Sequence, residues 1–297
     1  MIYAHLASNT IRVMKQPILG MCYARWITSR LIKKTPRANF NNGIRFGGFT
    51  SFSEYWLRHS GLDLEDLDVI RMVHSTCPPG SSLAIDIGAN LGLFSLSLSK
   101  IGFEKVYACE PIPTTHERLR SNLNLNPNLS GRIIPCLFGI GEHNTLADFL
   151  ISPTSPGQNK LLPPAAQTNS PTHQPIDTLP CRIMTLPAMF SEYQITRAHF
   201  IKMDVEGFES SILAGGLSLL RSGKVAFIYS EVIAEALSDA GSSLGQFQSL
   251  IEEAEFDPVI VRDSYNPTFE KVDFQTALSQ AGIRRNMLFR SRHFTQP

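Results

Sequence analysis

The sequence predicts a doubly wound α/β fold with a mostly parallel sheet, and three observations carry this prediction. Short apolar runs alternate with helical segments of roughly 10 to 15 residues, a spacing that favours crossover connections between parallel strands. A glycine-containing turn, DIGANLG, joins the first of these runs to the next helical segment. The chain of 297 residues is 43% hydrophobic, which is enough for a full core.

The individual elements follow from apolar periodicity and from the position of glycine and proline. The expected strands are residues 83–88, 105–111, 132–140, 199–204 and 224–232, and the expected helices are 62–74, 90–102, 115–126, 186–193, 209–223 and 243–254. Residues 256–263 and 284–294 are expected to form an antiparallel pair at the edge of the sheet, because mixed sheets often end in this way.

Residues 1–60 are expected to form a basic N-terminal extension and cover, and residues 61–297 the main domain. No Asp or Glu occurs between Met1 and Ser53. Residues 17–37 include a basic amphipathic helix, which suits packing on the domain, peripheral contact with a membrane or partner, or a cleaved organellar presequence. Residues 39–51 are rich in Asn, Gly and Phe and predict a hairpin or an irregular cover.

A proline-rich stretch at residues 152–180 interrupts the alternation of strands and helices. Proline cannot continue a helix or an inner strand, so this stretch is predicted to be a long loop or insertion. It suits either a disordered excursion or a lid over the site.

The bulk composition excludes several classes of protein. A formal charge of +1 gives no global attraction for nucleic acid. The five cysteines are far apart and form no CxxC pair, which favours reduced thiols over a disulfide framework or a zinc site. No run of about 18 apolar residues predicts a spanning helix, and no secretory signal is evident. We therefore expect a cytoplasmic protein.

The turn after the first strand is the first candidate for a binding site, because ligands of open parallel sheets bind beyond the carboxyl ends of the strands. Counted from Gly88, the dinucleotide fingerprint GxGxxG fails, since Asn90 and Leu93 stand where glycines are required. This disfavours a nicotinamide-dependent oxidoreductase. Asp86, at the strand end, would also repel a pyrophosphate.

S-adenosylmethionine fits this turn better, since it carries a sulfonium cation, an α-ammonium group, ribose hydroxyls and no phosphate. Gly88 and Gly92 would let the backbone approach it closely, and Asn90 tolerates a left-handed conformation. Glu110 ends the second strand, where an acid can accept hydrogen bonds from ribose hydroxyls.

Three segments of the chain resemble the FkbM-type family of S-adenosylmethionine-dependent methyltransferases. They contain the sequences IDIGAN, CEP and KMDVEG, and the resemblance covers about residues 78–232. It implies a Rossmann-like, seven-stranded class I methyltransferase fold and O-methylation of a hydroxyl on a sugar or other secondary metabolite. The chain departs from the family at residues 185–188, where TLPA replaces the usual acidic helix start.

The resemblance also assigns residues to roles. It implies cofactor contacts for Asp86, Gly88, Asn90, Gly92 and Glu110. It places Asp204, Glu206 and Gly207 in the family's DVEG motif and Glu231 at the acid that closes the fifth strand.

Methyl transfer to an aliphatic hydroxyl needs precise positioning and a general base. Asp204 and Glu206 follow the fourth strand two positions apart, so they project from one face if the strand geometry persists. Close like charges favour proton uptake by one of them. Our hypothesis is that Glu206 is the base or accepts the substrate hydroxyl, and that Asp204 positions cofactor or substrate.

Other interpretations remain open at this stage. DVEG could be a structural turn in which Glu206 caps the following helix. Glu231 could contact substrate or, with another strand-end acid, hold a divalent metal, although no further ligand is evident and no metal is expected. A catalytically silent module that binds S-adenosylmethionine would carry the same motifs.

Overall fold

A computed structural model describes residues 37–39, 43–47, 64–150, 160–161, 178–262, 268–281 and 286–295. The expected N-terminal helix and most of the proline-rich stretch lie outside these residues. No helix in the described part of the chain combines the length and the apolar character needed to cross a membrane.

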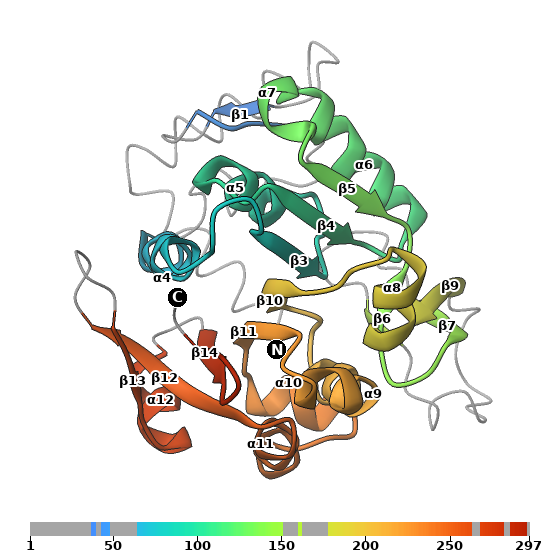
Figure 1. The fold of residues 1–297 in the computed structure, drawn as a ribbon. Helices are drawn as coiled ribbons and strands as arrows, with labels where there is room; N and C mark the ends of the chain where they lie inside the picture. The colour runs from blue at the N-terminus through green and yellow to red at the C-terminus, as the bar shows by residue number, and fades with distance from the viewer. Residues whose placement is uncertain are drawn as a thin grey trace, which may run out of the picture.

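An eight-stranded sheet runs through the described structure in the order β13-β12-β14-β11-β10-β3-β4-β5 (Figure 1). The strands from β11 to β5 are parallel, while β14, β12 and β13 pair antiparallel. Their bounds are β3 Leu83–Ile87, β4 Lys105–Cys109, β5 Ile133–Cys136, β10 Ala198–Met203, β11 Val225–Glu231, β12 Phe256–Arg262, β13 Thr268–Lys271 and β14 Asn286–Ser291.

The doubly wound, mostly parallel sheet is therefore confirmed, and so is the antiparallel pair formed by β12 and β14. The sheet has one strand more than expected among the described residues, because β13 pairs with the outer side of β12. The sequence of β13, TFEK, is short and largely polar, so its hydrophobic pattern gives no strand signal.

Helices cover both faces of this sheet (Figure 1). Neighbouring residues on β3 enter different cores: Ala84 belongs to the cluster that contains side chains of α4, α5 and α6, and Ile85 to the cluster that contains side chains of α8, α9 and α11. Such alternation is what two buried faces require. The helices are α4 Leu64–Ser75, α5 Leu93–Ile101, α6 Pro113–Asn124, α7 Pro127–Ser130, α8 Leu186–Glu192, α9 Glu209–Arg221, α10 Ala234–Asp239, α11 Leu244–Glu253 and α12 Phe274–Gln280.

Thr185 is the N-cap of α8, the helix whose start departs from the family pattern. Its side chain accepts a hydrogen bond from the N–H of Ala188, and Pro187 occupies the first turn. Proline is acceptable there because the first N–H groups of a helix have no intrahelical partner. A threonine cap thus serves in place of the missing acids.

A second sheet, which the sequence analysis missed, has the order β6-β9-β7-β8. Its strands are β6 Gly139–Ile140, β7 Thr145–Leu150, β8 Lys160–Leu161 and β9 Thr178–Met184, and in Figure 1 it lies at one side of the molecule, next to α8. The strand expected at 132–140 is consequently divided between β5 in the main sheet and β6 in this one.

Within the stretch predicted at 152–180 as a long loop or insertion, the structure describes two strand segments, β8 and the start of β9. Pro180 lies inside β9 and is opposite Asp148 on β7. On its other side β9 pairs with β6 only at Ile183 and Met184. Among the described residues, the strand thus has a neighbour at Pro180 on one side alone, which is where a strand can accept proline.

The hairpin expected at 39–51 is confirmed in part, as β1 (Arg37–Asn39) pairs antiparallel with β2 (Arg45–Gly47). Side chains of α6 and its end hold this cover on the domain: the N–H of Arg45 donates to Asn126 Oδ1 and that of Gly47 to Asn122 Oδ1, both at 2.8 Å.

Candidate functional site at the carboxyl ends of the strands

Four neighbouring strands end together at one edge of the main sheet. In the register, Ile87 of β3 lies opposite Met203 of β10 and Cys109 of β4, and Met203 lies opposite Ser230 of β11. The chain leaves β3 toward β4 and β5 and later returns to β10 on the other side of β3. This edge is therefore the topological switch point, where open α/β sheets bind ligands.

The predicted site residues follow these strands directly, so the fold brings them to this edge: Gly88 after β3, Glu110 after β4, Asp204 after β10, and Glu231 as the last residue of β11. Their roles in binding and catalysis stay predictions.

The turn after β3 contains three residues with positive φ: Gly88 at 77°, Asn90 at 50° and Gly92 at 88°. The left-handed conformation expected for Asn90 is thus present. Gly88 has a further constraint, because a Cβ placed on it would lie 2.0 Å from the carbonyl oxygen of Asp204. The turn therefore packs directly against the backbone that follows β10, and only glycine permits this contact.

Asp86 has no exposed surface and points into the protein. The hydroxyl of Ser95 on α5 donates to its Oδ2 at 2.5 Å, and Lys202 Nζ lies 3.3 Å from its Oδ1. Protein groups contact both carboxylate oxygens of Asp86. Asp86 would therefore affect a bound ligand indirectly, by holding the turn after β3 in place.

Glu110 is 5% exposed and supports the same turn. Its Oε2 accepts the N–H of Asn90 and its Oε1 that of Ile112, both at 3.0 Å. Burial raises the pKa of Glu110 to about 7, although the two N–H groups oppose this. Each oxygen keeps a second lone pair, so the carboxyl group can still accept a ligand hydroxyl.

In the DVEG turn, Glu206 is exposed and has a φ of 56°, unusual for a residue with a side chain. Gly207 has a φ of 103°, and a Cβ on it would lie 2.1 Å from the carbonyl oxygen of Ala236. Glu209, the first residue of α9, closes this turn, because its Oε1 accepts the N–H of Val205 at 3.0 Å; the N-cap residue Phe208 makes no side-chain cap. Burial raises the pKa of Glu209 to about 7.

The acids that follow β10 and the acid that ends β11 influence one another at this edge. Burial raises the pKa of Glu231 to about 8, and the charges of Asp204, Glu206 and Glu209 raise it further, while Lys202 opposes them. The Asp204 side chain is 44% exposed. Within the described ranges, no group of three or more His, Cys, Asp or Glu side chains could hold a metal ion.

Sequence reasoning missed Lys202, although a signal was present. Lys202 lies two positions after Phe200 in the buried strand β10, so the two side chains share a face of the sheet. The Lys202 side chain is only 8% exposed. A lysine inside an apolar strand needs acidic partners, because burial of an unpaired charge is costly. Asp86 lies directly opposite it in the register.

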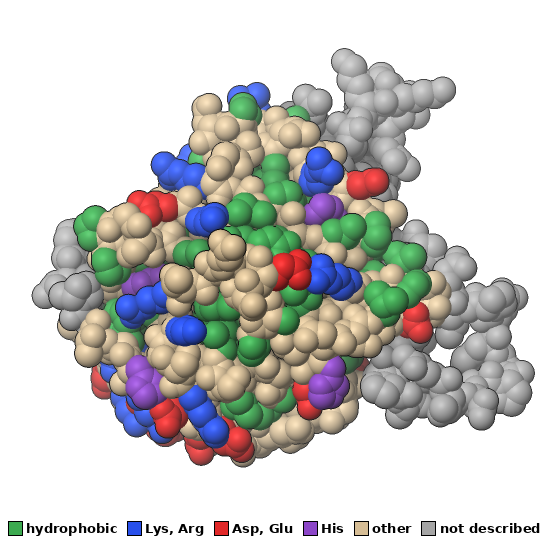
Figure 2. All heavy atoms as spheres, turned by 45° about the vertical axis from the view of Figure 1, so that its right-hand side comes forward, with side chains coloured by type: hydrophobic (Ala, Val, Ile, Leu, Met, Phe, Trp, Pro, Cys, Tyr) green, Lys and Arg blue, Asp and Glu red, His purple; other side chains and the backbone are tan. Residues whose placement is uncertain are grey.

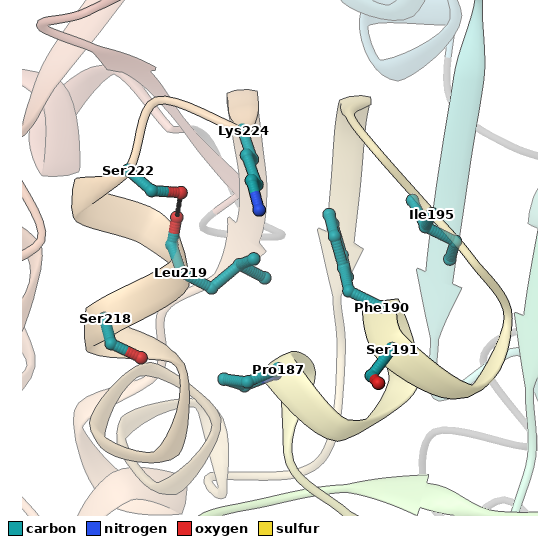
Figure 3. A pocket seen from close by; sticks show the side chains of 8 residues that line it. All are labelled: Pro187, Phe190, Ser191, Ile195, Ser218, Leu219, Ser222 and Lys224. Atoms are coloured by element: carbon teal, nitrogen blue, oxygen red, sulfur yellow. Dashed lines mark hydrogen bonds between the residues drawn. The ribbon is translucent and has the colours of Figure 1, made fainter.

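A pocket of about 340 Å³ lies elsewhere, between α8 and α9 (Figure 3). Phe190 and Leu219 line it, and Lys224 stands where β11 is about to begin. It is thus at the amino ends of β10 and β11, at the opposite end of the sheet from the predicted residues. We do not assign it to the candidate site.

In Figure 2, the described residues on this face show charges of both signs scattered among hydrophobic and neutral side chains.

Comparison with known proteins decides the family. The family model of the methyltransferase FkbM domain matches residues 86–258, more than half of the chain. The chain belongs to the FkbM methyltransferase family. The match begins at Asp86 and includes the end of β3, the strands β4, β10 and β11, and the turns that follow them, so the family's domain contains the whole candidate site.

Curated relatives agree with this family. Methyltransferase sdnD of Sordaria araneosa is 28% identical, over 46% of this chain and 61% of its own length. Hexuronic acid methyltransferase AglP of Haloferax volcanii is 26% identical, over 56% of this chain and 61% of its own length. The chain thus spans about six tenths of the length of these relatives.

Solved structures show more distant likenesses. A SAM-dependent methyltransferase from Agrobacterium tumefaciens is 12% identical with a TM-score of 0.45, covering 88% of this chain and 70% of that one. An O-methyltransferase from Bacillus cereus in complex with SAH is 13% identical with a TM-score of 0.38, covering 80% of this chain and 84% of that one. The family assignment does not depend on them.

Proposed function

We propose that this protein is an S-adenosylmethionine-dependent methyltransferase that methylates a hydroxyl group of a small molecule. One observation carries the proposal: the glycine turn of Gly88 and the acids Glu110, Asp204 and Glu231 come together at the switch point of the sheet. Membership of the FkbM family supports it.

The donor set at this edge suits S-adenosylmethionine. Carboxyl groups surround the turn, and these are acceptors for an ammonium group and hydroxyls but would repel phosphates. Glu110 would accept the ribose hydroxyls, and the turn from Gly88 to Gly92 would lie against the cofactor. Bound there, the cofactor would supply an electrophilic methyl group on a positively charged sulfur.

The residues after β10 would act on the acceptor. Glu206 is exposed at the strand end, where its carboxylate can accept the hydroxyl proton as general base. Asp204, which is paired with Lys202 at 3.2 Å, would orient the cofactor or the substrate. Glu231 would contact the acceptor from the neighbouring strand, and no metal ion is invoked.

A sugar or another hydroxylated secondary metabolite is the acceptor class that we propose. Support comes from one relative, whose name gives hexuronic acid as its substrate.

The first test is binding followed by transfer. Titration calorimetry should show S-adenosylhomocysteine binding to the wild-type protein. With S-adenosylmethionine labelled in its methyl group, label should pass to members of a panel of neutral glycosides, uronates and polyketide alcohols. Gly80→Ala, in a loop remote from the turn, serves as the control. A folded protein that binds neither compound would contradict the proposed function.

The second test concerns the base. Glu206→Gln keeps the size of the side chain but cannot take up the hydroxyl proton, so the rate of transfer should fall by about 10²- to 10⁴-fold while cofactor affinity stays within about twofold. Full turnover by a correctly folded Glu206→Gln protein would remove Glu206 from this role.

A further inference from the structure

The side chain of Lys202 makes three polar contacts that join separate parts of the candidate site. Its Nζ lies 3.3 Å from Asp86 Oδ1 and 3.2 Å from Asp204 Oδ2, and it donates to the carbonyl oxygen of Gly88 at 3.2 Å. The contact with Gly88 is a hydrogen bond and the contacts with the two carboxylates are ion pairs, so a single ammonium group interacts with all three segments. The ring of Phe94, with its centroid 5.3 Å from Nζ, covers a further side.

Lys202 is needed first as a counter charge. Asp86 is completely buried, and Ser95 satisfies only one of its oxygens. Its Oδ1 has no hydrogen-bond partner in the described structure, so compensation comes from the charge of Lys202. Burial opposes the charged form of Lys202, but Asp204 and Asp86 raise its pKa above the ordinary value. Lys202 is therefore a cation at neutral pH.

The contacts to Gly88 and Asp204 go beyond charge compensation, because they join the two halves of the site. Gly88 opens the turn assigned to the cofactor, and Asp204 opens the segment assigned to the acceptor. The backbones of these segments already touch, since the N–H of Asp204 donates to the carbonyl oxygen of Ile87 at 3.2 Å. The Lys202 side chain adds a link between the Gly88 carbonyl group and the Asp204 carboxylate.

We propose that Lys202 is a positioning residue that couples cofactor binding to the placement of the Asp204 carboxylate. This inference rests on the proposed function. Lys202 acts through Gly88 and Asp204 and needs no contact of its own with the reacting atoms.

The test is a double-mutant cycle measured as the affinity of folded protein for S-adenosylhomocysteine. Lys202→Met removes the charge and keeps the length of the side chain. Lys202→Met alone leaves Asp86 buried without a counter charge. The double variant Asp86→Asn with Lys202→Met is therefore made as well, because it removes both charges. Asp204→Asn is introduced into the wild type and into this double variant. Lys224→Met, at the other end of the sheet, is the matched control.

We expect loss of the Lys202 charge to weaken binding about tenfold, in keeping with the usual effect of a hydrogen bond to a charged group. Binding of S-adenosylmethionine should weaken by the same factor if the effect is one of position. Asp204→Asn should weaken binding in the wild type but add little in the double variant, because the link through Lys202 is already lost. Lys224→Met should bind as the wild type does.

Two results would overturn the inference while leaving the proposed function intact. One is unchanged affinity in both Lys202 variants. The other is an Asp204→Asn effect of equal size in both backgrounds, which would show that the two residues act independently. If the wild type bound neither compound, the proposed function would fall, and this inference with it. A role in stability alone would lower the melting temperature without changing the affinity of the folded protein.

Discussion

The conformation of Glu206 is costly for a residue with a side chain. A left-handed conformation costs about 1 to 2 kcal/mol for residues other than glycine, and such strain often marks functional positions. The next residue is Gly207, whose own positive φ and close contact with Ala236 hold the turn in place. The surrounding structure thus imposes the left-handed conformation on Glu206. This conformation leaves the Glu206 carboxylate exposed just after β10.

Replacing Glu206 by Gly and by Ala separates this backbone cost from the side chain. Both variants lose the carboxylate, so both should lose methyl transfer. Glu206→Gly should nevertheless be more stable than Glu206→Ala by about 1 kcal/mol, because glycine adopts the left-handed conformation freely. Denaturant unfolding measures the difference.

Ser249 provides the control for this comparison, since it is exposed in the middle of α11. There the order should reverse, with Ser249→Ala more stable than Ser249→Gly by about 0.8 to 1.0 kcal/mol. If Ala were the better residue at position 206 as well, the backbone there would carry no strain.

At the scale of elements, the contact between the β3 turn and the end of β10 fixes the geometry of the site. Gly88 and Gly80 allow this contact to be tested, because their φ values are nearly equal, at 77° and 75°. A Cβ on Gly80 would meet nothing within 4 Å, whereas one on Gly88 would meet the Asp204 carbonyl oxygen at 2.0 Å.

Gly80→Ala should therefore cost only the left-handed strain of about 1 to 2 kcal/mol. Gly88→Ala should cost about 1 to 3 kcal/mol more, because a backbone oxygen cannot move aside as a side chain can. It should also weaken S-adenosylhomocysteine binding, which Gly80→Ala should leave unchanged. Unfolding curves measure the free energy lost in each variant, and calorimetry measures the affinity for S-adenosylhomocysteine. An equal loss of stability in the two variants would show that the β3 turn can move away from β10.

The same elements show why sequence reasoning succeeded in part. Strands such as β10 are buried on both faces, so they appear as apolar runs, and the parallel order then brings Gly88, Glu110, Asp204 and Glu231 to one edge. Short strands with mixed polarity, such as β13, carry no such signal. Proline hid the start of β9, because its tolerance depends on which side of the strand is paired.

Side-chain partners within the site were harder to predict. The sequence indicates that Asp86 ends a strand, but its contacts with Ser95 and Lys202 depend on how α5 and β10 pack against β3. Likewise, the sequence does not show that Glu209 accepts the N–H of Val205, because this contact depends on the left-handed turn at Glu206 and Gly207.

For the whole molecule, the buried acids link stability to pH. The pKa of Glu231 is about 8 in the folded protein, against an ordinary value of 4.5, and burial is the main cause. Between these values the folded protein holds a proton that the unfolded chain has released. The contribution of Glu231 to the free energy of unfolding must therefore fall as pH rises from about 4.5 to 8.

Replacing Glu231 by Gln removes this contribution. The free energy of unfolding of Glu231→Gln minus that of the wild type should rise as pH increases from about 4.5 to 8 and stay level outside this window. In an Asp204→Asn background the upper end of the window should move below pH 8, because the Asp204 charge helps to raise the pKa of Glu231. Denaturant unfolding at a series of pH values measures both differences. A constant difference across the series would mean that the Glu231 carboxyl group is already ionised in the folded protein at neutral pH. An acceptor hydroxyl would then face a full negative charge at the end of β11.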